Sequence, residues 1–300
     1  MAVRETFLKT QQVADALGVS GSTIKRWVDS GALEATRTMG KHRLVALSSA
    51  LKFAREGKYP VENLLAFSAT SPLPAIDDLT VQSLLDHLKA GRSAEATSLI
   101  EAAYRSEGGA VALADRLIRP TMERVGHGWM IGAWDIYEEH QASQVVTSAL
   151  HRLIAEAARP RQGSRPLALG AAPESDPYIL PVLLGELVLR QLGWDVKNLG
   201  PNLPLRSLAQ ATRDHRPRLI FLSSSHLADR EGFLGDYAYF YEAASQVGSA
   251  IILGGRALDP DLRSRLVYAS FGDRMAHLAE FARRLAPSPE VSLIERSNQP

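Results

Sequence analysis

Residues 167–201 of the chain read LALGAAPESDPYILPVLLGELVLRQLGWDVKNLGP, and this stretch decides the fold that we expect. An apolar run ends in a loop rich in proline and acidic residues, a leucine-rich helix follows, and Gly193 ends that helix before a second alternating run. This order predicts a β-loop-α-β unit with two parallel strands. In open α/β sheets, ligands bind beside the loops that leave the carboxyl ends of the strands, so the loop at 176–181 is expected to line a ligand site.

The rest of the C-terminal half repeats the alternation of strand and helix. The patterns predict strands at 167–171, 195–199, 218–222, 250–253 and 267–271. They predict helices at 178–192, 205–215, 232–247 and 274–285. The expected domain is a five-stranded parallel sheet of flavodoxin-like or Rossmann-like form, covered by helices on both faces.

Polar and glycine-rich segments follow two of these strands. Ser223, Ser224 and Ser225 come after the third strand, and their hydroxyls suit a buried, elongated part of a ligand. Gly254 and Gly255 come after the fourth strand and permit a close backbone approach. With the 176–181 loop, these segments would form three sides of one site.

The 176–181 loop resembles the Asp-x-His-x-x-Gly loop of cobalamin-binding domains, with Tyr178 in place of the cobalt-ligating His and Pro181 in place of the Gly. The resemblance covers roughly residues 165–285. It implies a cofactor site built from the following residues: Asp176, Tyr178, Ser223, Ser224, Ser225, Gly254 and Gly255. A neutral phenol is a poor cobalt ligand, so three alternatives stay open. The domain binds cobalamin without the usual histidine, it binds haem or another tetrapyrrole such as biliverdin, or it binds no ligand.

The middle of the chain, at 76–159, has apolar residues three and four apart and breaks at Gly91, at residues 108–109 and at Gly132. This pattern predicts a bundle of four antiparallel helices. Most of its leucines are expected to form a core.

The segment 126–143 concentrates aromatic, histidine and acidic residues around Gly132. It resembles the Trp-x-x-Gly...Glu-His cap of CarH-type photoreceptors, which implies that Trp129, Glu139 and His140 hold the upper side of a cobalamin. Met130 stands where that family has a cobalt-binding His, and His127 is a candidate substitute because it lies on about the same helix face. The candidate metal ligands are therefore His127, Met130, His140 and Tyr178. The alternative is that Trp129 and His140 are core residues.

The first sixty residues have the pattern of a DNA-binding module. A helix at 10–17 with Thr10 as its N-cap ends at Gly18, and a second helix at 23–30 ends at Gly31, which is a helix-turn-helix spacing. On the second helix, Ile24, Trp27 and Val28 would pack inward. The residues expected to contact DNA are Ser22 in the turn before this helix, Thr23, Lys25 and Arg26 on the helix, and Arg37, Lys41, His42 and Arg43 on a wing at 35–44. The segment resembles the winged helix-turn-helix of the MerR family and of excisionase-type domains; a protein-interaction module is the alternative.

Composition agrees with this division. Residues 1–58 carry ten Lys and Arg against five Asp and Glu, a net charge of +5, while the whole chain of 300 residues carries only +1. The absence of cysteine excludes disulfides and thiolate metal sites. No apolar run approaches the roughly 18 residues needed to span a bilayer, so we expect a cytoplasmic protein without membrane contact.

The expected organisation is a winged helix-turn-helix domain at 1–60, a linker at 61–75, a four-helix cap at 76–160 and a cobalamin-binding-like domain at 165–290. The order of these modules resembles CarH-type and CarA-type regulators of the MerR family. The resemblance implies a non-enzymatic transcriptional regulator, a repressor, that binds a double-stranded DNA operator as a dimer or tetramer under control of a light-responsive cobalamin. The alternatives are an antirepressor that binds another regulator, and a corrinoid-dependent mutase or methyltransferase subunit.

Overall fold

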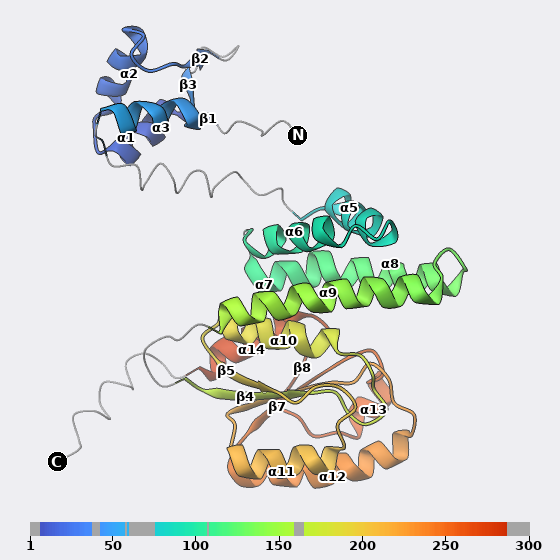
Figure 1. The fold of residues 1–300 in the computed structure, drawn as a ribbon. Helices are drawn as coiled ribbons and strands as arrows, with labels where there is room; N and C mark the ends of the chain where they lie inside the picture. Colours follow the sequence, from blue (N-terminus) through green and yellow to red (C-terminus); the bar gives the residue numbers. More distant parts are fainter. Residues whose placement is uncertain are drawn as a thin grey trace, which may run out of the picture. The chain divides into compact units, whose positions relative to one another are not determined.

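The computed structural model describes residues 7–37, 43–57, 59, 76–106, 108–158 and 165–286, which fall into two compact units. The first unit is residues 1–73 and the second is residues 74–300 (Figure 1). The predicted linker at 61–75 lies outside the described residues. Within the described ranges, no helix is long and apolar enough to cross a membrane.

The first unit packs three helices on a small antiparallel sheet with the strand order β1-β3-β2. Its elements are β1 (Phe7–Lys9), α1 (Thr10–Leu17), α2 (Gly21–Asp29), β2 (Thr36–Arg37), β3 (Arg43–Ala46) and α3 (Leu47–Glu56). Both predicted helices are present, and the two strand-like pieces of the expected wing pair as β2 and β3, with Arg37 opposite Arg43. Thr10 is the first residue of α1 rather than the residue before it. Strand β1 and helix α3 complete the unit and were not predicted.

Four helical segments open the second unit, as expected, and they break at the predicted glycines. They are α5 (Asp78–Lys89), α6 (Ser93–Tyr104), a continuous segment of α7 (Gly109–Ala112), η1 (Leu113–Ile118) and α8 (Arg119–Met130), and α9 (Ile136–Ala157). The η1 part is a π-helical turn, and Pro120 lies in the first turn of α8. Proline has no amide hydrogen to donate to the carbonyl four residues earlier, and this missing hydrogen bond explains the wider π-helical turn before Pro120.

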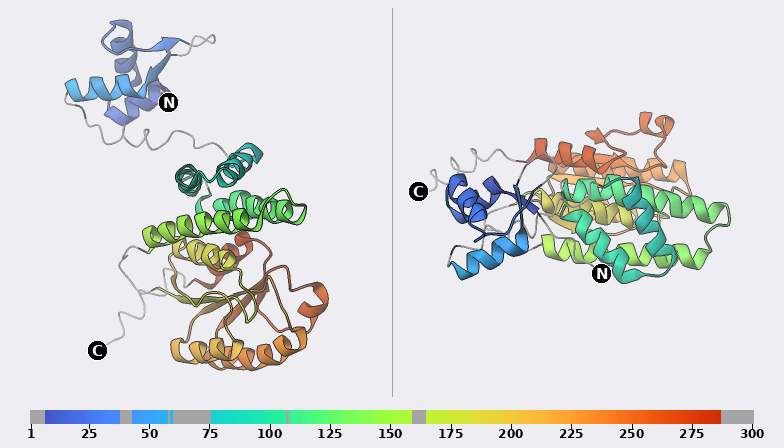
Figure 2. Two further views of the ribbon diagram at one scale, coloured as in Figure 1. Left: turned by 45° about the vertical axis from the view of Figure 1, so that its right-hand side comes forward. Right: turned by 90° about the horizontal axis from the view of Figure 1, so that it is seen from above.

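The predicted five-stranded parallel sheet is confirmed, with the order β5-β4-β6-β7-β8. The strands are β4 (Leu167–Ala171), β5 (Asp195–Asn198), β6 (Leu219–Ser223), β7 (Ala250–Gly254) and β8 (Ser270–Phe271). Helices α10 (Leu180–Gln191) and α14 (Met275–Leu285) cover one face, and α11 (Leu205–His215) and α12 (Arg230–Val247) cover the other (Figures 1 and 2). This is the flavodoxin-like order, in which the connections from β4 and β6 diverge at the carboxyl edge.

Two details of the expected sheet are wrong. The last strand was predicted to begin at Val267, but β8 begins at Ser270, and Val267 is 58% exposed, with its carbonyl accepting a hydrogen bond from the Tyr237 hydroxyl at 2.7 Å. A short helix, α13 (Pro260–Ser264), follows β7 and was not predicted. Its cap is local, since the Asp259 carboxylate accepts a hydrogen bond from the Leu262 amide at 2.9 Å.

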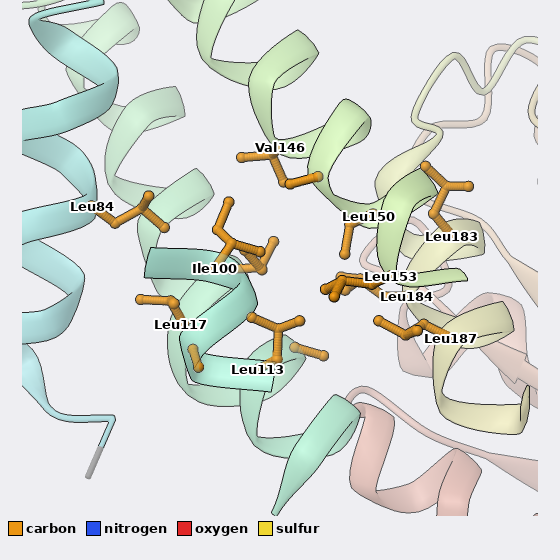
Figure 3. Close-up of a cluster of buried hydrophobic side chains, with 14 of the residues drawn as sticks. Leu84, Ile100, Leu113, Leu117, Val146, Leu150, Leu153, Leu183, Leu184 and Leu187 are labelled. Carbon is orange, nitrogen blue, oxygen red and sulfur yellow. The ribbon is translucent and has the colours of Figure 1, made fainter. Parts of the chain in front are cut away.

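The helical bundle and the sheet domain share one core. Leu150 and Leu153 of α9 are buried in the same cluster as Leu183, Leu184 and Leu187 of α10, and Figure 3 shows these side chains between the two helices. The bundle therefore packs directly on the α10 face of the sheet domain.

Candidate functional site

The loops that follow β4 and β6 are joined at the carboxyl edge of the sheet by Asp176. This residue is 0% exposed. Its Oδ1 accepts a hydrogen bond from the Tyr178 amide at 3.0 Å, and its Oδ2 accepts from the amides of Ser225 at 2.5 Å and His226 at 3.2 Å. The carboxylate thus satisfies three backbone donors from two loops, so it positions both loops.

Tyr178 and Arg256 form a second connection at the same edge. The Tyr178 hydroxyl accepts a hydrogen bond from Arg256 Nη2 at 3.2 Å, and the guanidinium lies 5.2 Å from the centre of the Tyr178 ring. Arg256 Nε also donates to the carbonyl of Ser225 at 3.3 Å. Tyr178 stays 46% exposed. Sequence reasoning missed Arg256, although its position directly after Gly254 and Gly255 was a usable signal.

Ser224 lies beneath the loop that follows β7. It is 0% exposed, and its hydroxyl has no hydrogen-bond partner among the described residues. Gly255 has a φ of +106°, and a Cβ there would lie 2.3 Å from the Ser224 carbonyl oxygen. The close backbone approach that the glycines were predicted to permit is therefore made between two loops of the chain itself. Ser223, Ser225 and Gly254 are half-buried around this contact.

Strained backbone marks the loops after β4 and β5. Ser175 and Asn202 are non-glycine residues with φ values of 70° and 55°. The Ser175 amide donates to Asn202 Oδ1 at 2.8 Å, and the Asn202 amide donates to the carbonyl of Asp176 at 2.9 Å. Such conformations cost on the order of 1 kcal/mol or more each and concentrate at functional edges. The four loops are thus linked into one rim, which we call the sheet rim, at 172–178, 199–203, 224–228 and 255–259.

The turn between α8 and α9 exposes a group of large apolar side chains. We call this group the apolar turn: Trp129 is 50% exposed, Met130 70%, Ile131 65%, Ile136 55% and Tyr137 65%. So many large exposed apolar side chains close together in one turn are uncommon on soluble domains unless the turn binds something. Figures 1 and 2 show the turn at the end of the unit where β4, β6 and β7 reach their carboxyl ends. The apolar turn and the sheet rim therefore belong to the same end of the second unit.

Polar contacts hold the apolar turn in shape. Lys89 donates to the carbonyl of Ala133 at 2.9 Å and to the Glu138 carboxylate, and its ammonium lies 4.9 Å from the centre of the Trp134 ring. The hydrogen bond from Lys89 lowers the pKa of Glu138. A Cβ at Gly128 would lie 2.4 Å from Trp134, so this ring packs on the helix backbone. Trp134 is a structural residue, and Trp129 is the exposed tryptophan.

The remaining cap residues are spread around the end of the bundle. Glu139 accepts a hydrogen bond from the Ser143 hydroxyl at 2.9 Å, and its other carboxylate oxygen lies 3.5 Å from His140 Nε2. His140 is exposed, as is His127, which stands two residues before Trp129 and so about 200° around the helix from it. Within the described residues, no group of three or more His, Cys, Asp or Glu side chains could hold a metal ion.

Helix α2 of the first unit divides into a buried and an exposed side. Ile24 is 0% exposed, and Trp27 packs on Phe53 at 4.8 Å between ring centres. The opposite side is open to solvent at Ser22, Lys25 and Arg26, with Thr23 half-buried. The Ser20 hydroxyl caps the helix by accepting a hydrogen bond from the Thr23 amide at 3.2 Å.

The structure describes Arg37 and Arg43 of the expected wing but not Lys41 and His42. Arg43 forms an ion pair with Asp29 at 2.5 Å, which ties β3 to the end of α2. Arg37 lies in β2, and Lys41 and His42 lie outside the described residues. Contact of all of these residues with DNA stays a prediction.

Comparisons with known proteins match both units. Residues 7–58 match a family model described as a helix-turn-helix domain, and residues 80–154 match one described as a B12 binding domain. The chain is 30% identical over 145 residues to the HTH-type transcriptional repressor CarH of Myxococcus xanthus; the alignment covers 48% of this chain and 46% of that protein. The chain thus spans about half the length of the curated relative it matches.

Among solved structures, the chain is similar to the monomethylamine corrinoid protein of Methanosarcina barkeri. The TM-score is 0.58 at 15% identity, covering 69% of this chain and 98% of that one. At this identity the likeness shows the fold alone. It agrees with the observed bundle packed on a five-stranded parallel sheet.

Proposed function

We propose that this chain is a transcriptional regulator of the CarH type, which binds an operator through its first unit and is controlled by a cobalamin at the sheet rim of its second. The observation that carries the proposal is the presence of a helix-turn-helix match and a B12-binding match on one chain, together with the 145-residue match to a repressor. The competing function is that of a corrinoid protein that carries methyl groups for an enzyme. That function would leave the helix-turn-helix unit without a role. We therefore favour regulation over catalysis.

For DNA binding, the proposal uses the exposed side of α2. Lys25 and Arg26 project from the second helix of a helix-turn-helix, which in this motif enters the major groove. The net charge of +5 over residues 1–58 favours contact with phosphates. Operators read by such units have repeated half-sites, so we expect the chain to act as a dimer or tetramer.

For cobalamin binding, the residues at one end of the second unit fit in part. The exposed ring of Trp129 suits the flat face of a corrin, and Tyr178 and Ser225 supply polar groups on the sheet rim. The buried, unpartnered hydroxyl of Ser224 can serve a ligand group only if the loop bearing Gly255 moves. When bound, adenosylcobalamin would supply a cobalt–carbon bond that light can break, while the chain's own residues orient the ligand and exclude water from it.

The test uses the full chain purified without ligand and incubated separately with adenosylcobalamin, haem and biliverdin. After desalting, absorption spectra are recorded before and after illumination. We expect cobalamin bands to co-elute with the protein and to change in light, and we expect Trp129→Ala to lose much of this retained cobalamin. Leu79→Ala, at an apolar position on α5 that is 78% exposed, is the matched control and should retain it.

The second half of the test is operator binding. An operator is selected from a random duplex pool in the dark, and the affinity of the full chain for it is measured by fluorescence anisotropy with and without adenosylcobalamin, in the dark and after illumination. We expect affinity to depend on the ligand and on light. Absorption bands from haem or biliverdin alone, or a colourless protein whose DNA affinity does not change with adenosylcobalamin or light, would refute the cobalamin-controlled regulator.

A further inference from the structure

We infer that His226, on the loop after β6, is the side chain that ligates the cobalt of a bound corrinoid from the sheet side. The inference rests on the proposed function, since it concerns how that same site would hold its ligand. It assigns to a different loop the imidazole that is missing at Tyr178.

The first argument is position. The amides of Tyr178 and His226 donate to the two oxygens of one carboxylate, that of Asp176, at 3.0 and 3.2 Å. Because the oxygens of a carboxylate are only about 2 Å apart, the backbones of the two residues must lie close together on the sheet rim. The His226 side chain thus starts from a point beside the one from which Tyr178 extends.

The second argument is availability. The Tyr178 hydroxyl is already engaged by Arg256 at 3.2 Å, whereas the His226 side chain is exposed and makes no hydrogen bond or ion pair with the described residues. A neutral imidazole is a good ligand for first-row transition metals, and a protonated phenol is not. His226 is therefore the better donor of the two.

The third argument is the location of the other histidines that the structure describes. His87, His127, His140 and His151 belong to the bundle, on α5, α8 and α9, and His215 ends α11 at the opposite edge of the sheet. His277 lies in α14 beyond β8, where it pairs with Asp273 at 3.2 Å. Strand β8 is three strands from β4, or about 14 Å. Of the described histidines, only His226 lies on a loop that follows β4, β6 or β7.

The experiment uses the full chain loaded with cobinamide, a corrinoid without the nucleotide base, in its divalent cobalt state. Any axial nitrogen ligand must then come from the protein. Electron paramagnetic resonance should show the triplet splitting of one axial nitrogen, and growth with histidine labelled with heavy nitrogen should convert the triplet to a doublet. His226→Gln should lose the splitting while still retaining cobinamide through its other contacts.

Matched variants separate the candidate ligands. His127→Gln, His140→Gln, His277→Gln and Tyr178→Phe should keep the nitrogen splitting. The inference is overturned if His226→Gln keeps the splitting, or if the unaltered chain retains cobinamide with no nitrogen splitting. If the unaltered chain retains no corrinoid, the proposed function itself is refuted, and this inference is refuted with it. Thermal melts check that each variant is folded.

Discussion

Replacing Asp176 by Asn should destabilise the second unit, because this buried carboxylate is the common acceptor for two loops of the sheet rim. Its two oxygens accept three backbone hydrogen bonds and are sealed from solvent. In Asp176→Asn, one oxygen becomes an NH₂ group that faces amide donors. Whichever way the new side-chain amide is turned, at least one of the three contacts places two hydrogen-bond donors opposite each other.

The expected size follows from the hydrogen bonds lost. Each hydrogen bond to a charged group is worth about 1.5–3 kcal/mol, and the acceptor also loses its charge in the contacts that survive. We therefore expect the free energy of unfolding of the second unit to fall by about 2–5 kcal/mol. The loops bearing Tyr178 and His226 should separate, so cobalamin retention should fall as well.

The assay is urea denaturation of the full chain, followed by far-UV circular dichroism and by tryptophan fluorescence, to which the buried Trp194 of the second unit contributes. Asp214→Asn makes the same chemical change at an exposed position, where the carboxylate accepts a hydrogen bond from Gln210 at 2.8 Å. Its effect should stay within about 0.5 kcal/mol. If Asp176→Asn behaves like Asp214→Asn, the carboxylate does not hold the rim together and the reasoning is refuted.

Three other substitutions, two of them paired with a comparison variant, test separate parts of the molecule. Arg26→Ala should weaken operator binding by about 1–3 kcal/mol in anisotropy titrations, whereas Lys52→Ala, exposed on α3, should change it little. Ile24→Ala should lower the stability of the first unit by about 2–5 kcal/mol, seen as a shift of its melting transition without a shift in that of the second unit. Gly255→Ala should cost the second unit about 2–4 kcal/mol in urea titrations, through its positive φ and its overlap with the neighbouring loop. Gly235→Ala, in open space on α12, should stabilise it by up to about 1 kcal/mol.

The helices and strands could be predicted because their ends are marked by local chemistry. Gly18, Gly31, Gly91 and Gly193 follow helices and have φ between 66° and 89°, a conformation that L side chains rarely adopt. The strand at 167–171 and the helix at 205–215 were predicted with their observed bounds. The last strand was predicted to start three residues too early, because Val267 is apolar yet exposed, and apolar character alone does not distinguish an exposed residue from one in a buried strand.

The loops after β4, β6 and β7 were expected to form one site, but the individual contacts between them were not predicted, since those depend on which strands are neighbours. Asp176 and Ser225 are 49 residues apart in the chain, and Tyr178 and Arg256 are 78 apart. They meet because β4, β6 and β7 are neighbours in the sheet. The sequence predicted a flavodoxin-like or Rossmann-like sheet, and the observed order is the flavodoxin-like one of these two. Asp176 was expected to touch a ligand, while the structure has it holding two loops.

In the proposed regulator, the core that the bundle shares with the sheet domain would limit how ligand binding at the rim changes the rest of the unit. Moving the bundle as a body would expose Leu150, Leu153, Leu183 and Leu187, at about 1.5–3 kcal/mol each, or about 6–12 kcal/mol together. To reverse a two-state equilibrium, a ligand must bind one conformer about 5.5 kcal/mol more tightly than the other. The free energy needed to separate the bundle is at least as large as this difference.

A conformational change confined to the apolar turn requires less energy than moving the whole bundle. It is exposed, and Lys89 holds it mainly through the contacts with Ala133, Glu138 and Trp134. We therefore expect ligand binding to change hydrogen exchange at residues 129–137 and to leave residues 183–188 of α10 unchanged. Altered protection across α10 would show that the bundle itself moves. Since Trp129 and Tyr137 belong to this turn, we expect a response confined to it to change the apolar surface that the turn exposes, and we expect the proposed oligomer to respond to that change.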